Sequence, residues 1–209
     1  MSEVAEGNLP RLILASGSRA RRDMLAAAGV AFAVETASVD EAAVRDELQQ
    51  GAAGPLPAEQ VALALAIAKA TAVSSLRSGA LVIGADQVLA LGADILSKPA
   101  SRAGAKAQLS QLRARKHALH SAVALVRDGE VMWMDVDTAE LTMRDFSDDF
   151  LESYLERSGD DICHCVGAYQ LEGVGVQLFE HIHGDYFTIL GMPLLPLLAE
   201  LRRHGIVLT

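Results

Sequence analysis

The stretch RLILASGSRARRDMLAAAG, residues 11–29, decides the fold class of this chain. Residues 11–16 are an apolar run that ends in small polar side chains, which predicts a β-strand followed by a loop. Within residues 18–29 the apolar side chains recur at helical spacing, with Ser16 or Ser18 available as the N-cap. A strand, a loop and a helix in this order are typical of an α/β fold.

The remainder of the chain continues this alternation and adds a hairpin. Asp128-Gly129 between two apolar segments is a strong hairpin signal, and residues 49–57 are rich in turn formers and predict a mobile loop. Residues 158–167 predict a second loop. The other predicted strands are residues 30–36, 81–84, 88–91, 120–126, 131–143 and 176–182, and the other predicted helices are residues 58–77, 101–112, 147–157 and 193–204. We therefore expect an α/β fold with a mixed sheet.

Length and composition bound the architecture and the compartment. The chain has 209 residues, 51% of them hydrophobic and 22% charged, which fits one medium domain or two lobes that share a core. No apolar run approaches the roughly 20 residues of a membrane span. Residues 1–10 have no pattern of a secretory signal, and we expect them to be a flexible N-terminus. Cys163 and Cys165 are poorly spaced for a disulfide, so we expect a cytoplasmic protein.

The charge balance narrows the class of ligand. A net charge of -9 argues against stable binding to nucleic acid, whose footprint would be basic. A small anion is still allowed if a few cations converge in one cleft and a divalent metal neutralises the rest. The four lysines that could contribute are Lys69, Lys98, Lys106 and Lys116.

The loop at residues 16–22 is the first candidate site. A turn of small residues before a helix presents backbone N–H groups and the positive end of the helix dipole, and an arginine in the first turn adds bidentate phosphate binding. The alternative is an ordinary capped helix with solvated arginines. The glycine and lysine spacing of a Walker loop is absent.

Carboxylates supply the second candidate. Asp86 follows the apolar run 81–84, where open α/β sheets bind ligands, and it suits a metal ligand or a general base; a turn is the alternative. Asp40 and Glu41 also follow a predicted strand, with an exposed acidic loop as their alternative. Lys69 in a mostly apolar predicted helix and Lys98 after a predicted strand are further candidate site residues, and a surface lysine is the alternative for each.

The segment Cys163-His164-Cys165 invites a comparison with zinc sites. A structural zinc ion needs a second pair of soft ligands at suitable spacing, and the sequence offers none. We therefore do not expect zinc.

Six motifs in order give the chain a specific likeness along residues 12–206. The chain resembles the Maf family of septum-formation inhibitors and nucleoside triphosphate pyrophosphatases. The matching segments are LASGS at residues 14–18 with Arg21 and Leu25, VDE at 39–41, AIAKA at 66–70, IGAD at 83–86, LSKP at 96–99, and GDY at 184–186 with GMPL at 191–194.

The resemblance implies a fold and a chemistry. It implies two lobes around a mixed, twisted sheet with a central cleft, like inosine triphosphate pyrophosphatases, over one domain at residues 11–209. Asp86 is implied as proton acceptor or metal ligand, with Glu41 helping to hold Mg²⁺ or Mn²⁺. Arg21, Lys69 and Lys98 are implied to bind the triphosphate, and a homodimer is common in the family.

Two departures from the family pattern indicate which nucleobase the substrate carries. The lysine expected before VGAY is Cys165, and the glutamine expected after the tyrosine is Glu172. An ionised glutamate only accepts hydrogen bonds, which suits the N–H donors of guanine and suits a positively charged 7-methylguanine better. The chain therefore resembles the branch that acts on 7-methyl-GTP, with dTTP or UTP as alternatives. Ala20 stands where that branch often has a stacking tryptophan.

A second class of function stays open on the sequence alone. Ala20 replaces the first arginine of the family's usual pair, and the lysine expected at Cys165 is missing. These changes allow a nucleotide-binding regulator of septum formation with little or no hydrolysis. An Asp86→Ala variant separates the two, because only a catalyst would lose its function with that carboxylate.

Overall fold

A mixed seven-stranded sheet forms the centre of the computed structural model, which describes residues 12–36, 38–51, 54 and 56–208. The order along the sheet is β2-β1-β3-β5-β6-β7, and β4 pairs with β3 beyond the end of β1. Strand β1 is parallel to β2 and β3, and all other pairs are antiparallel. The strands are β1 (Leu12–Leu14), β2 (Ala33–Val34), β3 (Leu81–Leu91), β4 (Asp94–Leu96), β5 (Lys116–Arg127), β6 (Glu130–Met143) and β7 (Phe179–His183).

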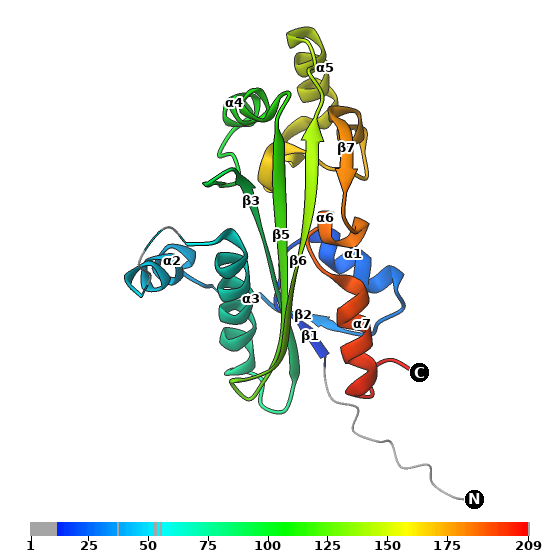
Figure 1. Cartoon of the computed structure of the whole chain (residues 1–209). Coiled ribbons are helices and arrows are strands. Elements are labelled where there is room, and N and C mark those ends of the chain that lie inside the picture. Colours follow the sequence, from blue (N-terminus) through cyan, green and yellow to red (C-terminus); the bar gives the residue numbers. More distant parts are fainter. Residues whose placement is uncertain (1–11, 37, 52–53, 55, 209) are drawn as a thin grey trace, which may run out of the picture.

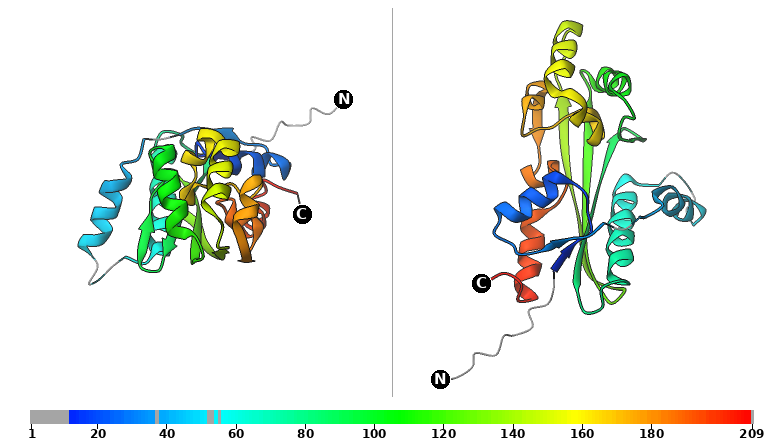
Figure 2. Two further views of the ribbon diagram at one scale, coloured as in Figure 1. Left: turned by 90° about the horizontal axis from the view of Figure 1, so that it is seen from above. Right: turned by 180° about the vertical axis from the view of Figure 1, so that it is seen from behind.

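Helices cover both faces of the long central strands (Figures 1 and 2). Helices α2 and α3 lie on one side of β3 and β5, and α1, α6 and α7 lie on the other. The helices are α1 (Arg19–Ala27), α2 (Glu41–Gln50), α3 (Ala58–Ser74), α4 (Arg102–Leu112), α5 (Asp148–Ser158), α6 (Tyr186–Ile189) and α7 (Leu194–Arg203), with 3₁₀ helices η1 (Gly159–His164), η2 (Val166–Ala168) and η3 (Val174–Leu178). The predicted α/β class with a mixed sheet is confirmed.

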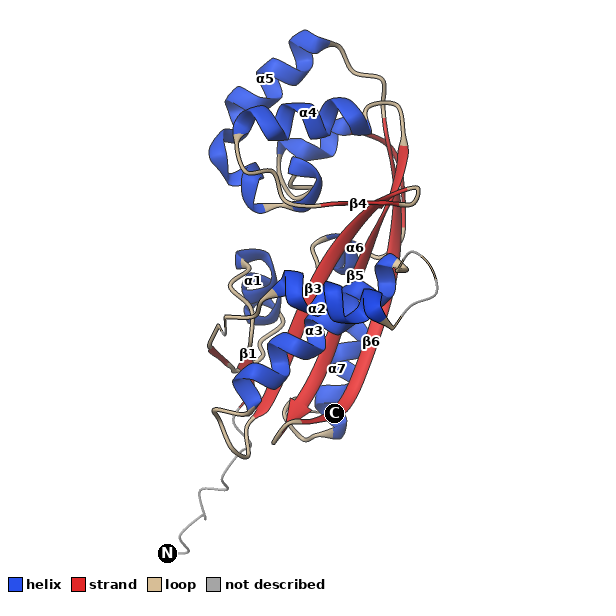
Figure 3. Cartoon of the chain, turned by 90° about the vertical axis from the view of Figure 1, so that its left-hand side faces the viewer, coloured by secondary structure: helices blue, strands red, loops and turns tan. Residues whose placement is uncertain are grey.

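The core is divided between two lobes that share β3, β5 and β6. The upper lobe in Figure 3 holds α4, α5 and the 3₁₀ helices around a cluster that includes Leu109 and Phe146. The lower lobe holds β1, α1 and α7 around a cluster that includes Leu25 and Leu197, with α3 packed on β3 and β5. Because the long strands run through both lobes, they fix the position of one lobe relative to the other. No helix among the described residues is both long and apolar enough to cross a bilayer.

Several local predictions are confirmed. Ser18 is the N-cap of α1, and its side chain accepts a hydrogen bond from the Arg21 backbone N–H. Asp128 and Gly129 both have positive φ in the turn between β5 and β6, as a tight two-residue hairpin requires. The predicted helices at 101–112, 147–157 and 193–204 are α4, α5 and α7 within one or two residues.

Other local predictions are wrong. Residues 41–50 form helix α2 instead of an acidic loop running into a turn-rich segment, because Asp40 caps the helix through the Ala43 N–H at 3.0 Å. Residues 52, 53 and 55 of the predicted 49–57 loop, and the predicted flexible residues 1–10, lie outside the described residues. The predicted strand at 30–36 is reduced to β2, and the predicted strand at 176–182 begins three residues later, after η3. The predicted loop at 158–167 folds into η1 and η2.

The two predicted strands at 81–84 and 88–91 are one continuous strand, β3, and Asp86 lies within it. The register explains this difference, since β1 pairs with β3 only as far as Ile83 while β5 pairs with it over residues 82–90. Asp86 therefore lies beyond the end of the parallel pair without ending the strand. The expected crevice is the gap along β3 between its pairing with β1 and its pairing with β4.

Candidate active site

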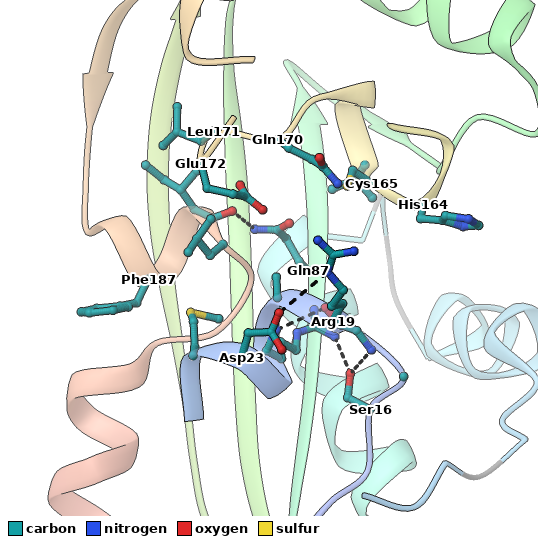
Figure 4. A pocket seen from close by; sticks show the side chains of 18 of the residues that line it. Ser16, Arg19, Asp23, Gln87, His164, Cys165, Gln170, Leu171, Glu172 and Phe187 are labelled. Atoms are coloured by element: carbon teal, nitrogen blue, oxygen red, sulfur yellow. Dashed lines mark hydrogen bonds and ion pairs between the residues drawn. The ribbon is translucent and has the colours of Figure 1, made fainter. Parts of the chain in front are cut away.

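A cleft of about 1050 Å³ lies between the two lobes, beside the part of β3 that pairs with β5 on one edge but with neither β1 nor β4 on the other. The loop between β1 and α1, Lys69 of α3 and strand β3 line it from the lower lobe, and η1, η2 and the turn after them line it from the upper lobe. Figure 4 shows polar side chains from both lobes around this space. The cleft is large enough for a nucleotide-sized ligand.

Lys69 holds the two candidate carboxylates together. Its Nζ lies 2.5 Å from Asp86 Oδ1 and 2.8 Å from Glu41 Oε1. Asp86 is buried on β3, and the Lys69 side chain reaches it from α3 with only 19% of its surface exposed. Glu41 approaches from the first turn of α2, the helix that the sequence did not predict. The structure therefore joins three predicted site residues in one ion cluster.

The charge around Glu41 keeps its carboxylate ionised. Partial burial alone would raise the Glu41 pKa, but the hydrogen bond and charge of Lys69, with the charges of Arg45 and Lys98, lower it overall. Lys69 and Lys98 line the cleft. Glu41 is not among the lining residues, and the ion pair with Lys69 connects it to the cleft. Lys98 follows β4 and is exposed on the opposite side of the gap in β3.

Arg21 is a buried structural link as well as a cleft residue. Its Nε donates to Gly191 O at 2.8 Å, and its Nη1 donates to Ala85 O at 2.9 Å and to Ser16 Oγ at 3.1 Å. Burial lowers the Arg21 pKa, and the charges of Asp86 and Glu41 oppose this effect. Among the described residues no acceptor bonds Nη2, so the two Nη2 hydrogens can bind an anion.

Ser16 presents a donor to the same space. Its Oγ accepts from Arg21 Nη1 and, at 3.3 Å, from the Ser18 backbone N–H, which leaves the hydroxyl hydrogen for a ligand. The Ser18 side chain is occupied as the N-cap of α1, although Ser18 also lines the cleft. The capped-helix and anion-site interpretations of this loop are thus compatible.

The upper lobe contributes two of the residues that depart from the family pattern. Cys165 and Glu172 both line the cleft, and in Figure 4 the Glu172 carboxylate is directed into it. Burial and the nearby Glu172 charge raise the pKa of the Cys165 thiol, although a hydrogen bond with Gln170 and the Lys98 charge lower it. Cys165 is therefore neutral near pH 7, and Glu172 faces no cation at that position.

The donor set fits a divalent cation held jointly with phosphate. Within the described part of the chain no three His, Cys, Asp or Glu side chains converge on a metal position. Two carboxylates, Glu41 and Asp86, do converge, and Mg²⁺ is commonly held by one or two carboxylates together with substrate phosphates. Lys69 Nζ lies between them, so it would have to yield one carboxylate oxygen to a bound cation.

Sequence analysis missed several polar residues of the cleft, and Gln87 is one of them. Its Nε2 lies 3.0 Å from each of three oxygens, Ser121 Oγ, Thr188 O and Ile189 O. The available signal was a polar side chain directly after Asp86 in an otherwise apolar strand. Its partners lie about 34 and 101 residues away in the sequence, and only the fold brings them together.

Comparisons with known proteins agree over nearly the whole chain. The family model described as Maf, Maf-like protein, matches residues 11–204. A 7-methyl-GTP pyrophosphatase of Rhizobium meliloti (strain 1021) is 50% identical over 95% of this chain and 98% of its own length. A nucleoside triphosphate pyrophosphatase of Nitrobacter winogradskyi is 52% identical over 94% of this chain and 95% of its own length.

Solved structures also match this chain, and we report one of them. It is a nucleoside-triphosphatase, or dITP/XTP pyrophosphatase, from Mycobacterium abscessus, with a TM-score of 0.37 and 18% identity over 93% of this chain and 94% of that chain.

Proposed function

This chain belongs to the Maf family, and we propose that it is a nucleoside triphosphate pyrophosphatase. The observation that carries the proposal is the ion cluster of Asp86, Lys69 and Glu41 at the wall of a nucleotide-sized cleft. We assign the activity to one domain over residues 11–209. Its two cysteines are free thiols, which supports our proposal of a cytoplasmic enzyme.

We propose that the triphosphate lies along the cation-bearing side of the cleft. A nucleoside triphosphate carries about four negative charges, so its binding requires concentrated positive charge in a protein of net charge -9. Lys69, Lys98 and the free Nη2 of Arg21 supply that charge, and the Ser16 hydroxyl adds a neutral donor. Mg²⁺ or Mn²⁺ held by Glu41 and Asp86 would neutralise charge that develops on the phosphates.

The proposed reaction is hydrolysis at the α-phosphorus. Asp86 accepts a proton from a water molecule as the water oxygen attacks the α-phosphorus. The bond from the α-phosphorus to the bridging oxygen breaks, and pyrophosphate leaves with that oxygen and its electron pair. Lys69 and Arg21 stabilise the negative charge that accumulates during this step. The products are the nucleoside monophosphate and pyrophosphate.

We propose 7-methylguanine as the preferred base. Glu172 offers a carboxylate, which accepts hydrogen bonds from N–H donors of guanine and attracts the positive charge of the methylated ring. Cys165 supports this choice, because a lysine there would repel a cationic base and a neutral thiol does not. Removal of modified nucleotides before they enter nucleic acid is the role that follows.

Pyrophosphate release from a nucleotide panel tests this proposal. The panel is 7-methyl-GTP, GTP, dTTP, UTP and ATP, each with Mg²⁺ or Mn²⁺, for wild type and Glu172→Gln. We expect 7-methyl-GTP to be the best substrate and Glu172→Gln to shift the preference toward dTTP and UTP. No release from any triphosphate would refute the pyrophosphatase assignment, and a panel preference unchanged in Glu172→Gln would refute the base assignment.

A further inference from the structure

The base-side segment, residues 165–172, forms one wall of the cleft. It runs from the end of η1 through η2 into the turn that follows. Cys165, Tyr169 and Glu172 are among its cleft-lining residues, and Figure 4 shows the side chains of Cys165, Gln170 and Glu172 along this wall. The directions of these side chains depend on the backbone conformation of the segment.

A strained turn lies in the middle of the base-side segment. Gly167 has a φ of +80° and Ala168 has a φ of +57°. A residue with a Cβ adopts this left-handed conformation at a cost, so contacts with the rest of the lobe must hold Ala168 in it. Ala168 is completely buried, and a Cβ at residue 167 would lie 2.4 Å from the Tyr169 ring and 2.7 Å from Leu89 Cδ1. The turn is therefore closely packed as well as strained.

Tyr154 supports this turn from helix α5. Its hydroxyl donates a buried hydrogen bond to Ala168 O at 3.1 Å. Burial raises the pKa of Tyr154 to about 12, so the phenol keeps its proton near neutral pH and remains a donor. Tyr154 is buried and is not among the described residues that line the cleft. Its hydroxyl therefore reaches the turn from the interior of the upper lobe.

A second hydroxyl anchors the next residue of the segment. The Tyr169 hydroxyl lies 2.9 Å from His117 Nε2 on β5, and the Tyr169 ring packs edge-on against Phe179 with centroids 4.9 Å apart. Both partners of this hydrogen bond are buried. Because Tyr169 is fixed separately, loss of the Tyr154 hydroxyl would release the turn at residues 167–168 without detaching the whole segment.

We propose that Tyr154 is a positioning residue for base recognition: its hydroxyl holds the base-side segment in the turn that directs Glu172 into the cleft. Ala168 comes three residues after Cys165 and four before Glu172, so a change of backbone conformation at Ala168 moves both side chains. This inference rests on the proposed function, in which Cys165 and Glu172 face the nucleobase.

The residues proposed for hydrolysis lie on other elements. Asp86 on β3 and Lys69 on α3 form the ion cluster with Glu41, whereas the Tyr154 hydroxyl is bonded to the base-side segment. Loss of this hydroxyl should therefore weaken nucleotide binding and base discrimination and leave the chemical step nearly unchanged.

Three variants test the role of Tyr154. Tyr154→Phe removes the hydroxyl and keeps the ring. Ser147→Ala is the matched control, because it removes one hydroxyl hydrogen bond at the start of the same helix, to the Phe150 N–H, away from the base-side segment. The double variant Tyr154→Phe, Ala168→Gly is the rescue, because glycine adopts a positive φ without strain.

We expect Tyr154→Phe to raise KM for the best substrate of the nucleotide panel by about threefold to tenfold, the effect of one neutral hydrogen bond, and to keep kcat within about twofold of wild type. The preference of wild type within the panel should narrow. The double variant should regain a KM close to that of wild type, and Ser147→Ala should keep the wild-type KM. A wild-type KM in Tyr154→Phe, a fall in kcat alone, or a double variant without recovery would overturn the proposal.

Hydrogen exchange followed by mass spectrometry gives a readout that needs no nucleotide. The amides of Ala168 and Gly173 are bonded to Cys165 O and Gln170 O, and they report opening of this region. In Tyr154→Phe the peptide that holds residues 166–173 should exchange about threefold to tenfold faster, and in Ser147→Ala it should exchange as in wild type.

The two readouts separate this inference from the proposed function. Absence of pyrophosphate release by wild type would refute the proposed function, whereas faster exchange in Tyr154→Phe would still support the hold of Tyr154 on the base-side segment. Release by wild type, with unchanged KM and unchanged exchange in Tyr154→Phe, would overturn the role of Tyr154 alone.

Discussion

Replacing Gly84 with alanine should push helix α3 away from strand β3 next to the ion cluster. A Cβ at residue 84 would lie 2.0 Å from Ala66 O and 2.8 Å from Ala70 Cβ, both on α3. These residues flank Lys69 in the sequence, and Asp86 lies two residues beyond Gly84 on β3. The substitution therefore acts on the two elements that bring Lys69 and Asp86 together.

The size of the effect follows from these distances. Ordinary contact with a carbonyl oxygen needs more than 3 Å, so α3 and β3 must separate by about 1 Å. Overpacking of this kind costs about 1–3 kcal/mol of unfolding free energy, equivalent to a loss of about 2–12 °C in Tm for a chain of this size. A displacement of about 1 Å in a reacting group can cost about 100-fold in rate, so kcat/KM should fall by about 10- to 100-fold.

Thermal unfolding and steady-state kinetics of Gly84→Ala measure both effects. Gly104→Ala is the matched control, because residue 104 lies in α4 and its Cβ would make ordinary contact, 3.4 Å from Pro99 Cβ. That change should leave kcat/KM unaltered and leave Tm unchanged or higher. A Gly84→Ala protein with wild-type Tm and wild-type kcat/KM would refute the argument from close approach.

Three further predictions concern residues outside the ion cluster. His117 is buried and its pKa is lowered by burial to about 4 from 6.5, so the neutral form stabilises the fold above pH 6.5. The free energy of unfolding of the wild type, measured in urea, should therefore fall by roughly 3 kcal/mol between pH 6.5 and pH 4. The exposed-site control His181→Gln should show the same loss, and His117→Phe should show a smaller one. Arg21→Lys cannot replace all three bonds of the guanidinium and should lower unfolding free energy by about 2–4 kcal/mol in urea; an unchanged midpoint would contradict the structural role. Ser147→Ala removes the N-cap of α5 and should cost about 1 kcal/mol in urea without changing kcat/KM, and a large loss of activity would count against the placement of α5 outside the site.

Local sequence patterns predicted the elements whose structure is set by their own residues. The hairpin at Asp128-Gly129 and helix α1 with its cap at Ser18 are examples, since turn geometry and capping depend on adjacent residues. The continuity of β3 was not predictable in this way. Gly84 and Asp86 are unfavourable in a strand by propensity, and pairing with β5 over residues 82–90 outweighs that preference.

Sequence reasoning likewise identified one part of the candidate site and missed another. The motifs and the family resemblance singled out Glu41, Lys69 and Asp86, and the structure joins them in one cluster. Helix α2, which carries Glu41, was missed because none of its residues is buried and its apolar spacing is weak. The direction of the Gln87 amide was also beyond local reasoning, because carbonyls about 100 residues away determine it.

The most direct test of the account compares Asp86→Asn with wild type in pyrophosphate release and in nucleotide binding. Asparagine keeps the shape of the side chain but cannot accept the proton of the attacking water. We predict that release falls by about 100- to 10,000-fold, the usual contribution of a general base, while the triphosphate still binds. An Asp86→Asn protein that releases pyrophosphate at the wild-type rate would contradict the proposed role of Asp86 and with it the assignment of the site.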